Sequence, residues 1–164
     1  IVATSLIFAG QSNLPTVYRY LRDGYNNREH RLAFHKAVSE FKTISDPDDL
    51  VIAPSEEMND IAASLRTYSL RPVYVSYKDG GIVVLDGELA RRWYNRYQES
   101  QNILESRDAR LLLDFMAQEG IDFAFVPNDY YTITESALVG HIATQTDQYL
   151  IIKKDLIDTS TGSP

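Results

Sequence analysis

Residues 50–54 read Leu-Val-Ile-Ala-Pro, an uninterrupted apolar run that ends at a proline. A run of this length without alternating polar residues is typical of a parallel strand that is buried on both faces of its sheet. Residues 121–127 read Ile-Asp-Phe-Ala-Phe-Val-Pro and end at a proline in the same way. The two segments therefore predict two strands in the interior of one sheet.

Helices and further strands are predicted around these two segments. Helices are predicted at residues 16–23, 28–41, 56–68, 87–104 and 107–119, the last of which ends at Gly120. The polar cluster at residues 24–27 separates the first two helices. Residues 73–77, Val-Tyr-Val-Ser-Tyr, are rich in branched and aromatic side chains and predict another strand. Residues 141–146 and 148–153 predict an antiparallel hairpin that turns near Asp147.

The order of these elements predicts the fold class. Strand, helix, strand, helix, helix, strand is typical of parallel strands covered by helices. We therefore predict an α/β domain with a three-layer, Rossmann-like architecture, in which a mostly parallel sheet ends in a C-terminal antiparallel edge hairpin. The single domain covers residues 28–156, after an apolar N-terminal segment and linker at 1–27 and before a disordered tail at 157–164. The uncharged residues 1–10 are either a buried element or the end of a membrane helix.

The composition excludes several classes of protein. Hydrophobic residues make up 44% of the 164-residue chain and charged residues 24%, which is typical of a folded globular domain. The formal net charge is -7, so we expect no nucleic-acid partner. The chain has no cysteine, which excludes disulfides, thiolate metal ligands and a cysteine nucleophile.

No cofactor and no metal site is predicted. The loop after the first strand, residues 54–57, has no glycine and contains two acids, so it does not suit a dinucleotide. Residues 46–49, Asp-Pro-Asp-Asp, are similar to the metal-binding D-x-D motif of some glycosyltransferases, but we interpret them as a turn. His30 and His35 are separated by about 140° around a helix axis, so they cannot share a metal ion.

The sequence Gly10-Gln11-Ser12-Asn13 is similar to the first block of SGNH-type carbohydrate esterases, in which the serine is the nucleophile. That chemistry also needs a histidine base beside an aspartate. His30, His35 and His141 are the three histidines, and none lies in the Asp-x-x-His motif of those families. We interpret the match as a coincidence, and a small stand-alone esterase that uses Ser12 remains an alternative.

Residues 71–96 hold the most unusual group of side chains in the chain. The predicted strand is followed by the loop 78–81, which contains a lysine, an aspartate and two glycines. The next predicted helix carries three arginines close to the single tryptophan. Arginine and lysine suit phosphate and carboxylate groups, so this segment predicts a contact surface for a small anion or a sugar. The candidate residues are Arg71, Lys78, Asp79, Gly80, Arg92 and Trp93. A plainer interpretation is that Trp93 packs on the sheet, Lys78 pairs with an acid and Arg71 caps a helix end.

Several short elements, taken in order, are similar to those of a known family. They are residues 44–54, the Arg-x-x-Ser-x-Arg-Pro element at 66–72, the loop 77–80, the Trp-Tyr-x-Arg element at 93–96, the strand 121–126 and the hairpin 141–153. Over residues 28–154 the chain resembles the soluble C-terminal domain of bacterial polytopic membrane proteins related to C-type membrane glycosyltransferases, which use lipid-linked sugars. The resemblance implies an extracytoplasmic domain, on the periplasmic or cell-surface side, that is tethered to a membrane portion.

We therefore expect a non-catalytic accessory or binding domain of a membrane protein in cell-envelope glycan assembly. The resemblance implies that catalytic acids lie in the membrane portion, so no catalytic residue is expected in this chain. The implied partners are that membrane portion and a glycan or lipid-phosphate substrate. A cytoplasmic protein-interaction module is a second alternative.

Overall fold

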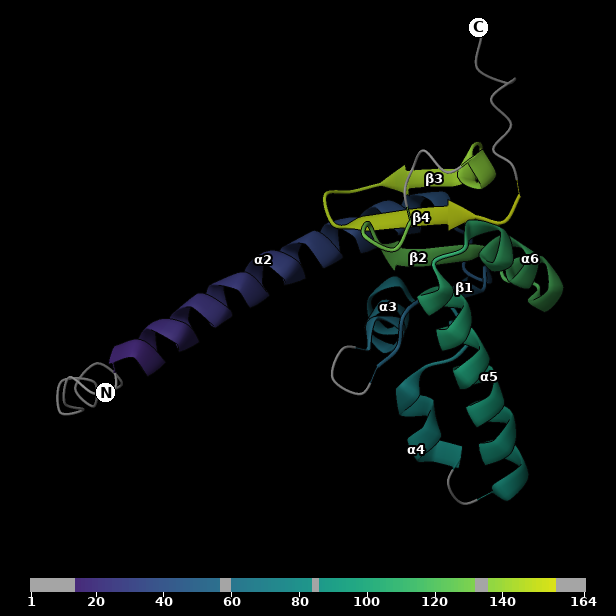
Figure 1. Cartoon of the computed structure of the whole chain (residues 1–164), viewed down its shortest axis with the longest axis horizontal. Coiled ribbons are helices and arrows are strands. Elements are labelled where there is room, and N and C mark those ends of the chain that lie inside the picture. The colour runs from purple at the N-terminus through teal and green to yellow at the C-terminus, as the bar shows by residue number, and fades with distance from the viewer. Residues whose placement is uncertain (1–13, 57–59, 84–85, 132–135, 156–164) are drawn as a thin grey trace, which may run out of the picture.

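The computed structural model describes residues 14–56, 60–83, 86–131 and 136–155 (Figure 1). Residues 1–10, Ser12 and residues 157–164 lie outside the described residues, so what the sequence predicts for them stays a prediction. Within the described residues, no helix is long and apolar enough to cross a membrane.

A four-stranded mixed sheet forms the middle of the molecule. Its strands are β1 (Val51–Ile52), β2 (Phe123–Pro127), β3 (Ile142–Gln145) and β4 (Tyr149–Lys153), in the order β1-β2-β4-β3. β1 and β2 pair in parallel, whereas β4 pairs antiparallel with both β2 and β3. The C-terminal edge hairpin is confirmed. The prediction of a mostly parallel sheet is wrong, because one of the three strand pairs among the described residues is parallel.

The strand predicted at residues 73–77 is reduced to a single bridge. Val73 pairs in parallel with Val51, on the side of β1 that faces away from β2. The chain then continues into the short 3₁₀ helix η2 (Tyr77–Asp79) and into helix α4 (Gly80–Val83). This conversion removes the third parallel strand from the sheet.

Local capping explains why this strand ends early. The Asp79 carboxylate accepts a hydrogen bond from Ser76 N at 3.0 Å, and Ser76 Oγ accepts one from Lys78 N at 3.2 Å. Serine and aspartate side chains compete in this way with the hydrogen bonds of a sheet. The branched and aromatic residues before them favour a strand. The hydrogen bonds of Ser76 and Asp79 stabilise the turn more than this preference stabilises the strand.

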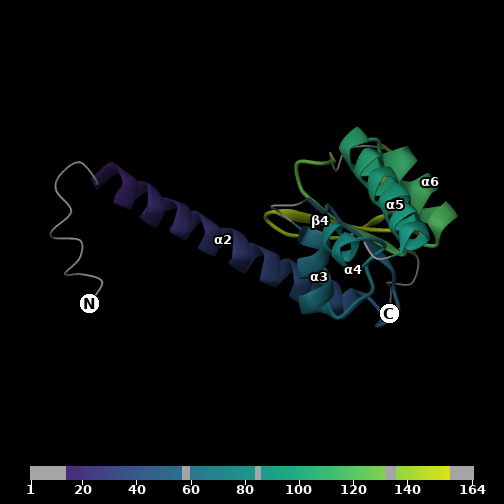
Figure 2. The ribbon, with the colours of Figure 1, turned by 90° about the horizontal axis from the view of Figure 1, so that it is seen from below.

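One continuous helix, α2 (Leu14–Ile44), replaces the two helices predicted before the first strand. Gly24 and the polar residues after it lie inside this helix and do not end it. A glycine inside a helix costs only about 1 kcal/mol relative to alanine, whereas two new helix ends would each leave backbone groups without partners. The end of α2 packs under the sheet, and its first half extends away from the rest of the molecule (Figure 1, Figure 2).

Helices cover both faces of the sheet (Figure 2). Alternate strand residues point to opposite sides, and since β1 and β2 are apolar throughout, both faces must be covered. On one face α2 and α3 (Ile61–Ser69) bury Ala37, Val38, Phe41, Ala62 and Leu65 against Val51, Phe123, Phe125 and Ile151. On the other face α5 (Gly87–Ser106) and α6 (Ala109–Glu119) bury Leu104, Leu112 and Met116 against Ile52, Ala124, Val126 and Ile152. The sheet is therefore the middle of three layers.

Helix α6 shows how far apolar spacing predicts burial. The sequence of this helix predicts an apolar stripe at Ala109, Leu112, Leu113, Met116 and Ala117. Leu112 and Met116 are fully buried, and Gly120 adopts a left-handed φ of 68° that ends the helix. Ala117, however, is exposed, and Phe115 is buried in its place. The stripe is confirmed in its centre and shifted at its end.

Two neighbouring leucines of α6 test this core. Leu112 is fully buried, whereas Leu111 is 47% exposed. We expect Leu112→Ala to lower the free energy of unfolding by about 2 to 5 kcal/mol, because it leaves a cavity. Leu111→Ala should change it by less than about 0.5 kcal/mol. Urea unfolding followed by circular dichroism measures both values, and equal losses would contradict the assigned faces of the helix.

Candidate functional site

A buried carboxylate joins the loop after β1 to the segment before η2. Asp60 is 8% exposed and accepts hydrogen bonds from Ser55 Oγ, Ser76 Oγ and Ala63 N, each at 2.8 Å. Ser55 Oγ in turn accepts a hydrogen bond from Tyr77 N at 2.6 Å. We call Ser55, Asp60 and Ser76 the Asp60 network. Paired buried polar groups of this kind fix one local geometry, which here positions the carboxyl end of β1.

Sequence analysis missed this network because it began the helix too early. The predicted helix starts at residue 56, whereas α3 starts at Ile61 with Asp60 as its N-cap. An aspartate directly before an apolar helix is a known N-cap signal and could have located this residue. The two serine partners carry no such signal, because they meet Asp60 only after the chain has folded.

Asp79 is held by Arg66 and not by Lys78. The Arg66 guanidinium donates two hydrogen bonds to the Asp79 carboxylate, at 2.6 and 2.8 Å. These bonds lower the pKa of Asp79 below its usual range and raise the pKa of Arg66. The pair therefore stabilises the fold above a pH of about 4, and this contribution is lost as the pH falls through the lowered pKa. The Lys78 side chain is exposed to solvent.

Trp93, on helix α5, packs against the turn that contains Ser76 and Gly80. Its Nε1 donates to the Ser76 carbonyl at 3.0 Å, and its ring stacks on Tyr97 with the centroids 5.5 Å apart. Gly80 lies directly against the ring, since a Cβ at this position would lie 2.5 Å from two of the ring carbons. The structure thus brings Asp79, Gly80 and Trp93 together, as the sequence predicts.

Two arginines and Trp93 line an open hollow of about 260 Å³, which we call the Arg92 hollow. Its other lining residues include Tyr74, Val75, Asp79 and Leu89. Arg92 lies 3.7 Å from Glu88, in a pair whose side chains are both largely exposed. Arg96 lies one helical turn from Arg92, so the two like charges repel each other by a few tenths of a kcal/mol. An anion bound between them would remove that repulsion.

Tyr74 connects this hollow to helix α6. Its hydroxyl donates to Glu119 Oε2 at 2.9 Å, and Arg96 lies over its ring, 5.4 Å from the centroid. Burial, and next the hydrogen bond to Glu119, raise the pKa of Tyr74. The hydroxyl therefore stays protonated at neutral pH, and the ring holds the Arg96 guanidinium at the hollow.

Arg71 lies apart from the other candidate residues. Its guanidinium donates to the Ser45 carbonyl at 2.8 Å, to Ser45 Oγ at 3.1 Å and to the Ser69 carbonyl at 3.3 Å. It therefore ties the end of α2 to the end of α3, at the amino edge of the sheet. The predicted proximity of Arg71 to Lys78 is not observed, and the contacts of Arg71 fit the plainer interpretation that it caps a helix end.

Among the described residues, no group of three or more histidines and carboxylates could hold a metal ion. Residues 46–49 form a turn, in which Asp49 N donates to the Asp46 carbonyl at 3.2 Å. His30 and His35 make different contacts: His30 Nδ1 lies 2.9 Å from Gln148 Oε1, whereas the ring of His35 packs edge-on against Tyr68.

Comparison of the chain with models of protein families, with curated proteins and with solved structures finds no match. The resemblance to domains of membrane glycosyltransferase relatives therefore stays a prediction. The site itself offers binding chemistry, because two arginines beside an aromatic ring suit a small anion that carries an apolar group.

Two adjacent glycines test the contact with Trp93. A Cβ at Gly80 would overlap the Trp93 ring, whereas a Cβ at Gly81 would meet nothing within 4 Å. We expect Gly80→Ala to lower the free energy of unfolding by about 1 to 3 kcal/mol and to shift the fluorescence of the single tryptophan. Gly81→Ala should leave the fluorescence unchanged and gain up to about 1 kcal/mol of helix propensity. An unchanged Trp93 spectrum in Gly80→Ala would argue against the contact.

Proposed function

We propose that this chain is a non-catalytic binding domain that lies outside the cytoplasm, tethered to the membrane portion of a polytopic protein. Its parent would act in cell-envelope glycan assembly and be related to membrane glycosyltransferases. The observation that carries the proposal is helix α2, which holds the domain at the end of an arm (Figure 1, Figure 2).

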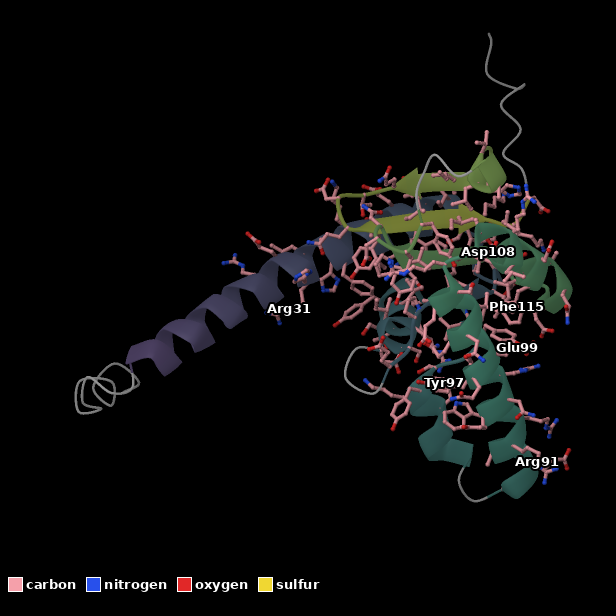
Figure 3. The ribbon with its side chains drawn as sticks, viewed as in Figure 1. Arg31, Arg91, Tyr97, Glu99, Asp108 and Phe115 are labelled. Atoms are coloured by element: carbon pink, nitrogen blue, oxygen red, sulfur yellow. The ribbon has the colours of Figure 1, made fainter. Side chains whose placement is uncertain are left out.

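Helix α2 has 31 residues and is about 46 Å long at the usual rise per residue. Its last part packs on the sheet and on α3 through Ala37, Val38 and Phe41, which are at most 3% exposed. Its first half continues along the same axis away from the three layers (Figure 1, Figure 2), and Figure 3 shows Arg31 near the middle of the helix. Such a helix would hold the domain at a fixed distance from a membrane portion that precedes it.

Two acids at this edge of the sheet, Asp60 and Asp79, serve the fold. Asp60 accepts the hydroxyls of Ser55 and Ser76, and Asp79 accepts both bonds of Arg66. Carboxylates that are engaged by structural donors are poorly placed to exchange protons with a substrate. These contacts favour binding over catalysis at this edge.

We assign the partner contact to the Arg92 hollow. Arg92 and Arg96 suit the oxygens of a phosphate group, while Leu89 and Trp93 offer apolar surface to the carbons beside it. Lys78 adds an exposed cation on the neighbouring turn. The proposed ligand is the phosphate of a lipid-linked sugar. A long polyanion fits less well, because the chain carries a net charge of -7.

We also propose that the fold is a shortened Rossmann-like unit. β1, α3 and Val73 repeat the parallel strand–helix–strand connection of such folds, and β2 pairs with β1 on its other side. The turn at Ser76 would then mark where the neighbouring strand has been lost.

The lack of cysteine in this chain makes its location directly testable. Single cysteines would be placed in the parent protein at two exposed positions, Asp147→Cys in the β3–β4 turn and Gln118→Cys on α6. We expect a membrane-impermeant maleimide to label both in intact cells, because the domain lies outside the cytoplasm. The parent without an introduced cysteine is the control. Labelling that requires disruption of the membrane would place the domain inside the cell and contradict the proposal.

Trp93 fluorescence tests the assigned contact independently. Farnesyl phosphate serves as the probe for a lipid phosphate, and inorganic phosphate as the probe for phosphate alone. We expect farnesyl phosphate to change the Trp93 emission saturably, because its phosphate and its chain both meet the hollow. The double variant Arg92→Ala, Arg96→Ala should weaken this binding about tenfold or more, since charge-assisted hydrogen bonds are lost.

Arg91→Ala is the matched control. Arg91 belongs to the same helix and is exposed, but it is not among the lining residues and points to the outer side of α5 (Figure 3). Its removal should change the dissociation constant by less than about twofold. Binding that survives the double variant, or no saturable binding, would overturn the assignment to the Arg92 hollow. The maleimide result would stand separately.

A further inference from the structure

A second cavity lies where α2, α3, β2 and β4 meet. It has a volume of about 420 Å³ and is lined by His30, Pro127, Asn128, Asp129, Gln148 and Tyr149, with Ile61 at the start of α3. It shares no lining residue with the Arg92 hollow. We call it the Asn128 cavity.

The cavity lies where the chain switches sides of the sheet. After β1 the chain forms α3 on one face and returns to pair through Val73 on one side of β1. It reaches β2, on the other side of β1, through α5 and α6 on the opposite face. The loops at the carboxyl ends of β1 and β2 therefore diverge. In α/β sheets, ligands bind in the crevice that such a divergence leaves.

Asn128 lies in the wall of this crevice, and its side-chain amide holds an acceptor that is unpaired within the described part of the chain. Its Nδ2 donates to the Thr146 carbonyl at 2.8 Å, which sets the orientation of the side-chain amide. Its Oδ1 is buried and has no hydrogen-bond partner among the described residues. Because buried polar atoms of folded proteins are nearly always paired, this oxygen is short of one donor, and a small shift of the side chain would open it to a donor in the crevice.

His30 and Gln148 add polar groups from two other elements. His30 Nδ1 lies 2.9 Å from Gln148 Oε1. The Gln148 amide nitrogen and His30 Nε2 take no part in this contact, so each can bond to a ligand. Asp129 adds an exposed carboxylate, and Tyr149 adds a half-buried aromatic ring. The cavity thus combines several acceptors, one amide donor and an aromatic wall.

The charges around the cavity disfavour an anion. Among the described residues, those that line the cavity include no lysine or arginine, and Asp129 contributes a negative charge. Arg107, 4.0 Å from the Asp129 carboxylate, is not among the lining residues. The second amide of α3, Ala62 N, donates to the Pro54 carbonyl at 3.0 Å, and the third, Ala63 N, donates to Asp60, so neither is free for a phosphate.

We propose that the Asn128 cavity binds a neutral saccharide. Sugar hydroxyls donate to Asp129 and, after a small shift of the Asn128 side chain, to Asn128 Oδ1, and they accept from the Gln148 amide. The C–H face of a sugar ring suits the Tyr149 ring. The volume lies within the usual range for small-ligand sites. This inference goes beyond the proposed function, because it uses different residues and opposite chemistry from the Arg92 hollow and does not depend on a membrane tether.

An NMR titration of the 164-residue chain tests this proposal. The probes are the methyl glycosides of glucose, galactose, mannose and N-acetylglucosamine, with inorganic phosphate as the anionic comparison. We expect at least one glycoside to shift the side-chain amide signals of Asn128 and Gln148 saturably. Phosphate should leave these signals unchanged, because the cavity offers it no cation.

His30→Ala and His35→Ala are a matched pair of variants. Both histidines are exposed on α2, but only His30 is among the residues that line the Asn128 cavity. We expect His30→Ala to weaken glycoside binding about five- to tenfold and His35→Ala less than about twofold. The proposal is overturned if no glycoside shifts the Asn128 and Gln148 signals, if both variants weaken binding equally, or if phosphate binds there instead.

Discussion

The Asp60 carboxylate makes the interaction on which the rest of the structure depends. A buried carboxylate is unfavourable unless hydrogen bonds satisfy its oxygens, and here two serine hydroxyls and the first turn of α3 do so. The Ser76 that Asp60 fixes also accepts the indole N–H of Trp93 through its carbonyl and donates its amide to Asp79. The position of α5, and with it the Arg92 hollow, therefore follows from one buried acid.

The same constraint explains why the sheet is mixed. Once Ser76 is held by Asp60, the chain turns into η2 four residues after the Val73 bridge. The sheet cannot extend on this side of β1, so it extends on the other side, through β2 to the antiparallel pair β4 and β3. Strand propensity at residues 73–77 is real, but it is weaker than a capped turn anchored to a buried carboxylate.

Sequence analysis predicted the elements that local periodicity determines, such as α5, the centre of α6, β2 and the C-terminal hairpin. It missed the pairing of Arg66 with Asp79 and of Asp60 with Ser76, because these residues meet only through the fold. It also expected Arg71 beside Lys78. Arg71 precedes the Val73 bridge and bonds to Ser45 and Ser69, whereas Lys78 lies beyond the bridge in η2, so these two residues lie at opposite edges of the sheet. Of the candidate site, Asp79, Gly80, Arg92 and Trp93 were predictable as one group, and the Asn128 cavity was not.

The two proposed binding surfaces differ in how they involve the arm. Among the described residues, none of α2 lines the Arg92 hollow, so a ligand there would leave the arm untouched. The Asn128 cavity includes His30 of α2, which is bonded to Gln148 before β4. A ligand that fills this cavity contacts the arm and the sheet together, and its binding free energy adds to the packing that holds α2 against the domain. Occupation of the cavity would therefore stiffen the junction between the arm and the domain, whereas occupation of the hollow would not.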